Sequence, residues 1–209
     1  ADSPEEEVAG AFLQSGQADA VIVVVDASCL RRGLILALQL RQQTQRLVLC
    51  VNLMDEAARR GVTPQTERLG QLLDVPVVAT AARSGKGLAE LRRQAAAMCR
   101  RESWEDGWKL TYVPPVEAAL GLLETGMSRR RAVALLWGSP PTEEEQSLWQ
   151  RAQQRLGALS GQALRDSLTA SVVALAEEIG RQCVRCAGPD PHAPDRRLDR
   201  LLTSRLSGF

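Results

Sequence analysis

An amide and a carboxylate stand three positions apart at the end of an apolar run. In "LVLCVNLMDEAARRGV" (47–62) the apolar residues lead to Asn52, and Asp55 follows. A carboxylate has two acceptor oxygens in a fork, so Asp55 could accept hydrogen bonds from the N1–H and the N2 amine of guanine together. Adenine lacks this pair of donors and would leave the carboxylate without partners, at a cost of about 1–3 kcal/mol. The spacing therefore favours a site that reads guanine.

A second stretch has the small residues that a base pocket needs. In "TAARSGKG" (80–87) Ala81 and Ala82 leave room for backbone N–H groups to approach the O6 side of the base. Gly85 and Gly87 permit a tight turn into the next helix. We therefore expect this stretch to form the other wall of the site.

A simpler interpretation remains for the first stretch. Asn and Asp are common in turns, so Asn52 and Asp55 could merely cap the turn after a strand. The combination of a preceding strand with "TAARSGKG" after a later strand favours base recognition over capping.

The "SGKG" sequence is not a phosphate loop. The pattern G-x-x-x-x-G-K-[ST] needs Gly at the position that Thr80 occupies, and Ser or Thr at the position of Gly87. No other stretch of the chain matches. The sequence thus contains parts that read a base, without the parts that hold phosphates and Mg²⁺.

The first half of the chain alternates strands and helices. Apolar runs at 18–28, 46–52 and 75–82 predict strands covered on both faces. Helical patterns lie between and after them, at 30–43, 64–73 and 88–101. This order predicts an α/β fold with a parallel sheet and flanking helices. Ligands of such sheets bind outside the carboxyl ends of the strands, where both polar stretches fall.

The second half changes character. "ESWEDGWKLTYVPP" (102–115) is rich in linker residues, and no strand-like run follows it. Helical spacing occurs at 116–124, 129–137, 141–156 and 161–186, where Glu143 to Glu145 predict an acidic first helical turn. We therefore divide the chain into 1–101, an α/β part; 102–115, a linker; 116–195, a small all-helical domain; and 196–209, a basic amphipathic segment.

Composition excludes several functions. Aromatic residues make up 3% of the chain, there is one His (His192), and the net charge is +1. These values argue against a stacking platform for nucleic acid and against a His-based metal centre. The five Cys are irregularly spaced and fit a reducing compartment. No run is apolar over the length that a membrane span needs.

Together these stretches resemble the GTP-binding domain of the ferrous iron transport protein B (FeoB) family. The resemblance lies in "SPEEEVAGAFLQSGQADAVIVVVDASCLRRGLILALQL", "VNLMDEAARRGV" and "VPVVATAARSGKGLAEL", and covers residues 2–100. "DRRLDRLLTSRLSGF" is similar to the segment that enters the family's membrane domain. The fold that this implies is a partial P-loop GTPase-type sheet.

The resemblance assigns roles to particular residues. Asn52 and Asp55 would read guanine, and Ala81, Ala82 and Arg83 would line the base pocket, mainly through backbone groups. GTP or GDP would be the ligand, with Mg²⁺ ligands outside this chain. The family implies Fe²⁺ transport at the cytoplasmic face of the bacterial inner membrane, with a helical domain that couples nucleotide state to the permease.

The departures from the family limit the activity expected of this chain. Its phosphate loop, first switch and D-x-x-G box are absent from the 209 residues. Those parts supply most phosphoryl-transfer catalysis. We expect the chain to be a fragment of a GTP-dependent transporter that binds GTP weakly and, alone, hydrolyses none measurably.

Three further features are assigned mainly structural roles. Cys183 and Cys186, near His192, are too few for a structural zinc site and are interpreted as packing thiols. Arg129 to Arg131 could contact anionic lipid or an acidic partner, but such a run is more often the solvated face of a helix, and we interpret it so. The Arg and Leu residues of 196–209 fit either a contact with the membrane or an ordinary docked helix.

Two alternative functions stay open. The chain could be a non-catalytic adaptor with a degenerate nucleotide fold, or part of a GTPase of RNA processing. The second would be expected to carry a basic RNA-binding extension, which the sequence does not show. No nucleic-acid partner is expected, and the sequence is compatible with an oligomer.

Overall fold

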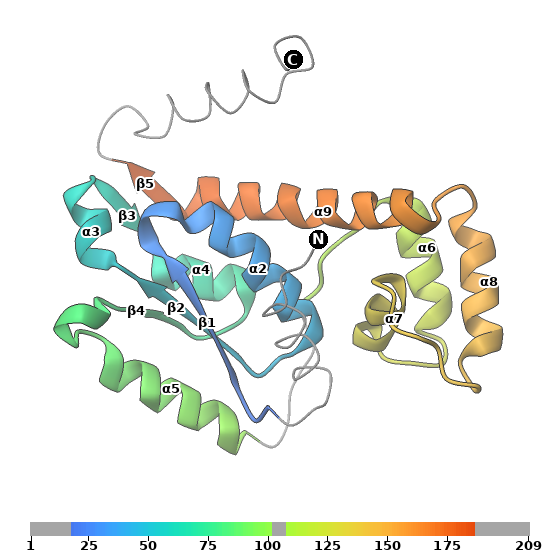
Figure 1. The fold of residues 1–209 in the computed structure, drawn as a ribbon, viewed down its shortest axis with the longest axis horizontal. Helices are drawn as coiled ribbons and strands as arrows, with labels where there is room; N and C mark the ends of the chain where they lie inside the picture. Colours follow the sequence, from blue (N-terminus) through green and yellow to red (C-terminus); the bar gives the residue numbers. More distant parts are fainter. Residues whose placement is uncertain (1–17, 102–107, 187–209) are drawn as a thin grey trace, which may run out of the picture.

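The computed structural model describes residues 18–101 and 108–186. Figure 1 shows an α/β lobe beside a helical lobe, with one long helix running along both. The helices are α2 (Leu30–Gln43), α3 (Met54–Arg59), α4 (Thr66–Leu73), α5 (Leu88–Arg100), α6 (Pro114–Leu123), α7 (Arg129–Leu136), α8 (Gln146–Leu156) and α9 (Gly161–Cys183), with 3-10 turns η1 (Ala27–Cys29) and η2 (Ala82–Ser84). The strands are β1 (Val21–Asp26), β2 (Leu47–Asn52), β3 (Val62–Pro64), β4 (Val77–Ala79) and β5 (Val184–Cys186).

The predicted parallel sheet is confirmed. Its order is β1-β2-β4, with both pairs parallel. Asp26 lies beside Asn52, and Val51 lies beside Ala79, so the carboxyl ends of all three strands meet at one edge. We call this edge, with the loops that follow it, the rim.

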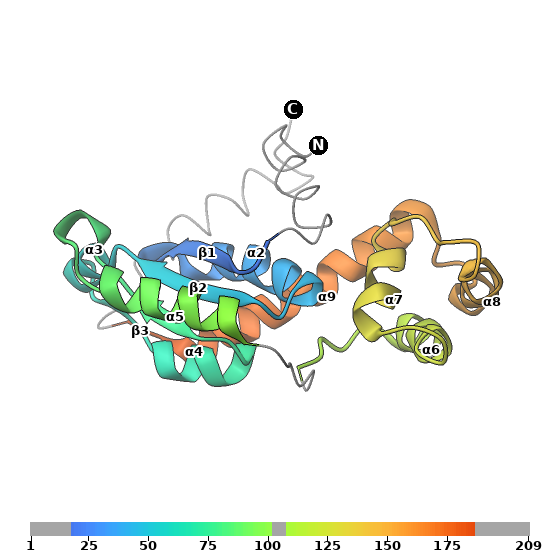
Figure 2. The ribbon, with the colours of Figure 1, turned by 90° about the horizontal axis from the view of Figure 1, so that it is seen from below.

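Helices cover the two faces of the sheet unequally. Helices α2 and α4 pack on one face, with α9 against them. Helix α5 covers the other face, where Met98 packs with Val48 and Val78 (Figure 2). Every residue of β2 from Leu47 to Val51 is buried, as expected of a central strand.

Strand β1 differs from the prediction that both its faces are covered. Val23 and Val25 are buried under α2, whereas Ile22 is 43% and Val24 is 59% exposed. The prediction was wrong here because β1 is the edge strand, beyond the reach of α5. The sheet therefore has an apolar strip that the described residues leave open.

Glycine at position 33 sets how closely α2 approaches the sheet. A Cβ at Gly33 would lie 2.6 Å from the Cβ of Val25, well inside contact distance. The bare Cα thus lets α2 lie directly on β1, whose last residue is part of the rim.

Helix α9 joins the two lobes. Its buried residues recur about every four positions along one face: Leu164, Leu168, Val172, Ala176, Ile179, Gly180 and Cys183. This stripe packs on α2 and α4, and a single buried cluster extends from the sheet into the helical lobe. The domain division drawn from the sequence stays a proposal, since α9 contributes to both lobes.

The second half also contains a strand, which corrects the prediction of helices alone. Helix α9 ends at Cys183, and β5 pairs antiparallel with β3, with Cys186 opposite Val62. Three residues are too few to show the alternation of a strand, and Pro64 was assigned to the following helix. The pairing forms only because the C-terminal end of α9 lies beside β3.

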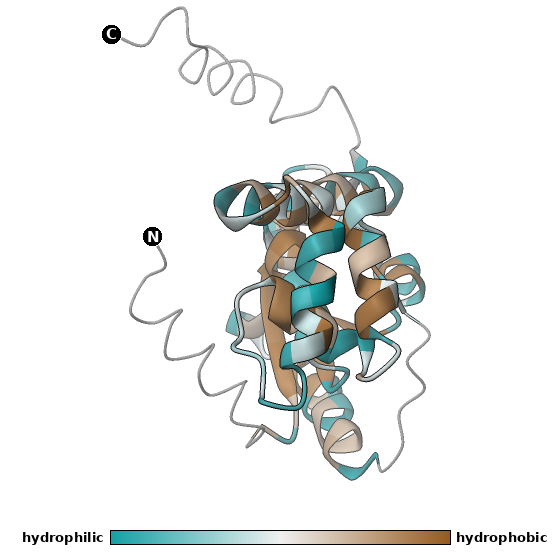
Figure 3. Cartoon of the chain, turned by 90° about the vertical axis from the view of Figure 1, so that its right-hand side faces the viewer, coloured by the Kyte–Doolittle hydropathy of each residue, from teal (hydrophilic) through white to brown (hydrophobic). Residues whose placement is uncertain are grey.

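Arginines of the helical lobe pair with carboxylates, so the interpretation of Arg129 to Arg131 as a solvated face was wrong for two of them. The Arg129 guanidinium contacts Glu117 at 2.7 Å and Glu124 at 3.0 Å, and its side chain is 17% exposed. Arg131 binds Glu145 at 2.6 Å. Hydropathy varies along the helices of this lobe, with apolar stretches beside polar ones (Figure 3).

The predicted acidic helical turn is also corrected. Helix α8 begins at Gln146, so Glu143 to Glu145 precede it. The bond from Arg131, aided by the backbone N–H of Thr142, lowers the pKa of Glu145 to about 2. Glu145 is the N-cap of α8, and its bond to Arg131 joins α7 to the start of that helix.

Among residues 18–101 and 108–186, none of the helices has both the length and the apolar character that crossing a bilayer requires. The segment 196–209, with its predicted membrane contact, lies outside the described residues.

We predict opposite effects of alanine at two helical glycines. Gly33→Ala should lower the free energy of unfolding by about 1–3 kcal/mol, because the new methyl group overpacks against Val25. Gly121→Ala, on an open face of α6, should raise it by about 0.5–1 kcal/mol. Urea unfolding of both variants tests this, and a Gly33→Ala protein as stable as the parent would contradict the close packing.

Candidate functional site

The rim is held together by the side chain of Asn52. Its Oδ1 accepts a hydrogen bond from the Thr80 hydroxyl at 3.0 Å and another from the backbone N–H of Ala82 at 3.1 Å. Asn52 ends β2, whereas Thr80 and Ala82 follow β4. One amide oxygen therefore joins the loops after two neighbouring strands.

This arrangement fixes which way the amide faces. A backbone N–H can only donate, so the atom that faces Ala82 must be the oxygen of Asn52. The amino group Nδ2 then points the other way, and no described residue accepts from it. Asn52 thus offers a free donor pair at the rim, suited to a carbonyl oxygen or ring nitrogen of a ligand.

Asp55 lies in the first turn of α3, directly after Asn52 and the bend at Leu53. Its carboxylate is 53% exposed and meets Arg59 at 3.5 Å, a loose pair one helical turn away. Exposed pairs of this kind contribute only about 0.3–0.5 kcal/mol. A ligand with two adjacent donors could therefore replace Arg59 easily.

The capping interpretation of Asn52 and Asp55 was wrong. The N-cap of α3 is Leu53, which makes no side-chain capping bond. Neither polar side chain binds a backbone N–H at the start of α3. Asn52 reaches across to the next loop instead, and Asp55 keeps its carboxylate on the surface.

The loop that carries Asp55 is tied to β4 by backbone bonds as well. Leu53 adopts φ 60°, a left-handed conformation that is strained for a side chain of this size. The strain is held by the N–H of Met54, which donates to the Thr80 carbonyl at 3.2 Å. The N–H of Thr80 in turn donates to Val51 at 2.8 Å. These backbone bonds therefore fix the start of α3, which carries Asp55, relative to the sheet.

Ala81, Ala82 and Arg83 form the facing loop, with their N–H groups partly in use. The N–H of Ala81 donates to Lys86 at 3.1 Å, and that of Ala82 donates to Asn52. Ala81 is buried, while Ala82 and Arg83 are exposed in η2. In this structure the Ala82 N–H thus orients Asn52, and the roles of these three residues toward a base stay a proposal.

Gly87 is required where the loop passes the end of β4. It has φ 82°, and a Cβ there would lie 2.2 Å from the carbonyl oxygen of Ala79. Gly85 has a similar φ of 78° but has open space around it. The close approach at Gly87 brings the start of α5 against the rim.

Sequence reasoning missed two residues of the rim. Thr80 is 1% exposed, and its hydroxyl contacts both Asn52 and the thiol of Cys50 at 3.2 Å. Asp26 ends β1, where its Oδ1 accepts from the N–H and the hydroxyl of Ser28. Their positions directly after strands were the available signal, since those positions fall at the rim of any parallel sheet.

The described residues contain no cluster suited to a metal ion. No group of three or more His, Cys, Asp or Glu occurs within 18–101 and 108–186. The Cys183 side chain is fully buried, and burial raises the pKa of its thiol. A protonated, enclosed thiol supports the packing role predicted for Cys183, whereas His192 lies outside the described residues.

Fold and rim together define a class of protein. A parallel α/β sheet with an Asn-x-x-Asp pair and a small-residue loop on adjoining strand ends, followed by helices, is an arrangement that suits a nucleotide-binding domain. Residues 1–95 match the family model described as ferrous iron transport protein B. This match covers a little under half of the 209 residues, and that part of the chain resembles the family.

Curated relatives agree over part of the chain. The Fe(2+) transporter FeoB of Helicobacter pylori (strain J99) is 42% identical over 80 residues, which are 38% of this chain and 12% of the relative. That of Salmonella choleraesuis is 31% identical over 127 residues, or 61% of this chain and 16% of the relative. The matched part is thus a small share of each relative's length.

Solved structures show the same fold over a longer stretch. The cytosolic domain of the Thermotoga maritima FeoB iron transporter in its GMPPNP form has a TM-score of 0.70 at 23% identity. The match covers 88% of this chain and 75% of that one. The cytosolic domain of Legionella pneumophila FeoB has a TM-score of 0.67 at 24% identity, again over 88% and 75%. The helical lobe is therefore part of the shared fold.

We predict that alanine is tolerated at Gly85 and not at Gly87. Gly85→Ala meets only the left-handed backbone strain, about 1–2 kcal/mol. Gly87→Ala adds a clash with the Ala79 carbonyl, for a total of about 3 kcal/mol or more. Thermal or urea unfolding compares the two, and equal losses of stability would show that the loop does not pass β4 as described.

Proposed function

We propose that this chain is the guanine-recognition part of a GTP-dependent ferrous iron transporter, together with the helical region that couples its nucleotide state to a membrane permease. GTP and GDP are the proposed ligands, Fe²⁺ is the proposed cargo, and the cytoplasmic face of the inner membrane is the proposed location. The observation that carries the proposal is the rim geometry at Asn52 and Asp55.

Base recognition follows from the donors and acceptors on offer. The Nδ2 of Asn52 can donate to the O6 or N7 edge of guanine. The Asp55 carboxylate pairs only weakly with Arg59, one helical turn away. It can accept hydrogen bonds from the N1–H and the N2 amine of guanine. These groups match guanine, because adenine has an amine in place of O6 and lacks the N1–H and N2 donors that Asp55 would accept from.

The open face of β1 supports the proposal that a larger domain is involved. Ile22 and Val24 expose an apolar strip on an edge strand, where a further segment would bury them. In the proposed transporter, that segment would belong to the part of the G domain that handles phosphates and Mg²⁺. No catalytic residue is assigned within this chain.

Coupling to other parts of the transporter has a short physical route. Helix α3 carries Asp55 and is followed at once by β3, which pairs with β5. The N–H of Gln65 also donates to the Cys183 carbonyl at 2.8 Å. Strand β5 leads directly to residue 187 and the C-terminal segment. A displacement of α3 by a bound base would therefore be transmitted through β3 and β5 toward that segment.

We predict that Asp55→Asn changes base preference from guanine to xanthine. Xanthine carries a carbonyl at C2, so the amide of Asn can donate to it while accepting from N1–H. The ratio of GDP to XDP affinity should fall by about tenfold or more, since a mismatched polar pair costs about 1–3 kcal/mol. Equilibrium titration of the 209-residue chain with each nucleotide gives the ratio.

The matched control is Asp166→Asn, an exposed Asp on α9 that bonds only Gln162. It makes the same chemical change away from the rim and should leave the ratio unaltered. A ratio that is the same in the parent and in Asp55→Asn, or that Asp166→Asn changes equally, would remove guanine recognition from Asp55.

A further inference from the structure

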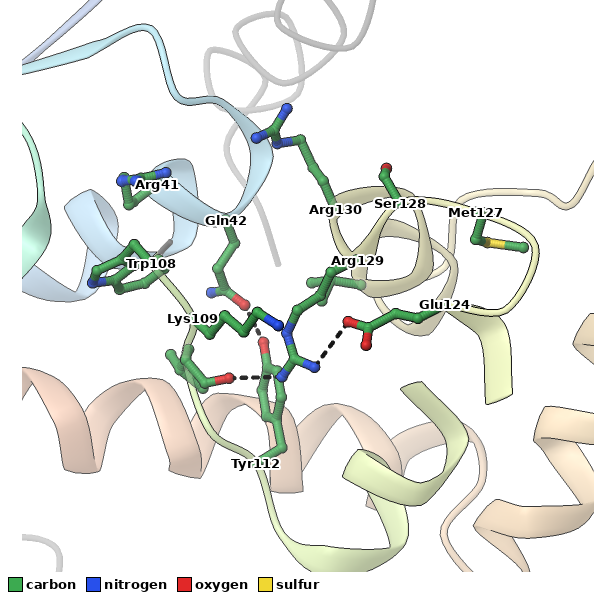
Figure 4. A pocket seen from close by; sticks show the side chains of 12 residues that line it. Arg41, Gln42, Trp108, Lys109, Tyr112, Glu124, Met127, Ser128, Arg129 and Arg130 are labelled. Atoms are coloured by element: carbon green, nitrogen blue, oxygen red, sulfur yellow. Dashed lines mark hydrogen bonds and ion pairs between the residues drawn. The ribbon is translucent and has the colours of Figure 1, made fainter. Parts of the chain in front are cut away.

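A pocket lies between the two lobes. Its volume is about 350 Å³, and its walls come from the end of α2, the segment 108–112, the turn before α7 and α7 itself (Figure 4). This volume falls at the lower end of the range of small-molecule sites, about 300–1,000 Å³. The pocket is therefore large enough for a small metabolite.

The pocket is distant from the rim. Helix α2 starts at the rim, after β1 and η1, and runs back toward the amino ends of the strands. The pocket is lined by Arg41 and Gln42, at the far end of this 14-residue helix. At 1.5 Å per residue the two sites are roughly 20 Å apart. The pocket is thus not part of the base site.

Positive charge dominates the lining. The charged residues that line the pocket are four cations, Arg41, Lys109, Arg129 and Arg130, and one carboxylate, Glu124. In Figure 4 the side chains of Lys109 and Arg129 lie close together between α2 and α7, whereas Arg130 points away from them. Carboxylates balance part of this charge, because Arg41 pairs with Asp74 at 3.4 Å and Arg129 pairs with Glu117 and Glu124.

Two of the cations are fixed in place. Arg129 donates to Glu117, Glu124 and the Leu110 carbonyl at 2.7–3.0 Å. Arg41 donates to the Leu73 carbonyl at 3.1 Å and lies 5.1 Å from the centre of the Trp108 ring. Held guanidinium groups lose little further side-chain freedom when a ligand arrives, which favours binding.

Lys109 is the cation left for a ligand. It is exposed, and within the described residues its ammonium group has no ion pair or hydrogen bond. The buried pair formed by the Tyr112 hydroxyl and the Gln42 amide closes the inner end of the pocket. Lys109 can therefore move onto an anion that rests against Arg129.

We propose that this pocket binds a small, soluble phosphate-bearing anion, such as a molecule with one or two phosphate groups. Phosphate oxygens accept several charge-assisted hydrogen bonds at once, from guanidinium and ammonium donors together. Because the ligand would touch both α2 and α7, its binding stabilises one arrangement of the two lobes.

Inorganic pyrophosphate is the probe. We expect saturable, salt-sensitive binding to the 209-residue chain, measured by calorimetry and by the tryptophan fluorescence of the chain, to which Trp108 in the pocket wall contributes. Lys109→Gln should weaken binding by about tenfold, the loss of one charge-assisted bond of roughly 1.4 kcal/mol. Lys109→Arg should restore most of the affinity.

The control for net charge is Arg92→Gln, an exposed residue of α5 that makes no bond within the described residues. It should leave pyrophosphate binding unchanged, as should Asn52→Ala at the rim, which keeps this test separate from that of guanine recognition. An equal loss in Arg92→Gln and Lys109→Gln would overturn the proposal.

A lipid headgroup is the competing source of the same chemistry. Vesicles of phosphatidylcholine with phosphatidic acid, sedimented with the chain, test for it. Binding to these vesicles with no saturable binding of free pyrophosphate would overturn the assignment to a soluble ligand. Pyrophosphate binding that Lys109→Gln weakens by about tenfold, with no vesicle binding, is the expected result.

Discussion

The side-chain oxygen of Asn52 accepts two hydrogen bonds, and the rest of the site depends on them. They join the end of β2 to the loop after β4 and turn the amide nitrogen toward the open side of the rim. A hydrogen bond of this kind contributes only about 0.5–1.5 kcal/mol to stability. Its larger effect is geometric, because it holds the two loops between which a flat base would lie.

The sheet supplies the rigidity on which this geometry rests. Strand β2 is buried from Leu47 to Val51, and β4 pairs with it in parallel register, so the points at which the two loops leave the sheet are fixed. The same α/β lobe is tied to α9 and, through β5, to the residues directly after α3. The β3–β5 pair thus connects the residues directly after α3 to the end of α9, while the cationic pocket lies at the opposite end of α2.

Sequence patterns predicted the parallel sheet, its main helices and the stretch that carries Asn52 and Asp55, because these depend on local periodicity and on strand ends. They missed Thr80, whose bond to Asn52 spans 28 positions and has no local signature. The three-residue strands β3 and β5 were missed because each is stable only through the other. Arg129 was predicted to face solvent, because its carboxylate partners lie 5 and 12 positions away along the chain and no local sequence pattern indicates the pairing.

We infer that the first turn of α3, which carries Asp55, and the loop of Ala82 form the two walls of one guanine site. The most direct measurement is an amide nuclear magnetic resonance titration of the isotope-labelled chain with GDP, which detects weak binding residue by residue. We predict that GDP shifts the amide signals of Asp55, Ala82 and Arg83 together with a single midpoint. ADP at the same concentrations should leave the chemical shifts of these signals unchanged. Equal shifts with ADP, or GDP shifts confined to residues away from the rim, would contradict it.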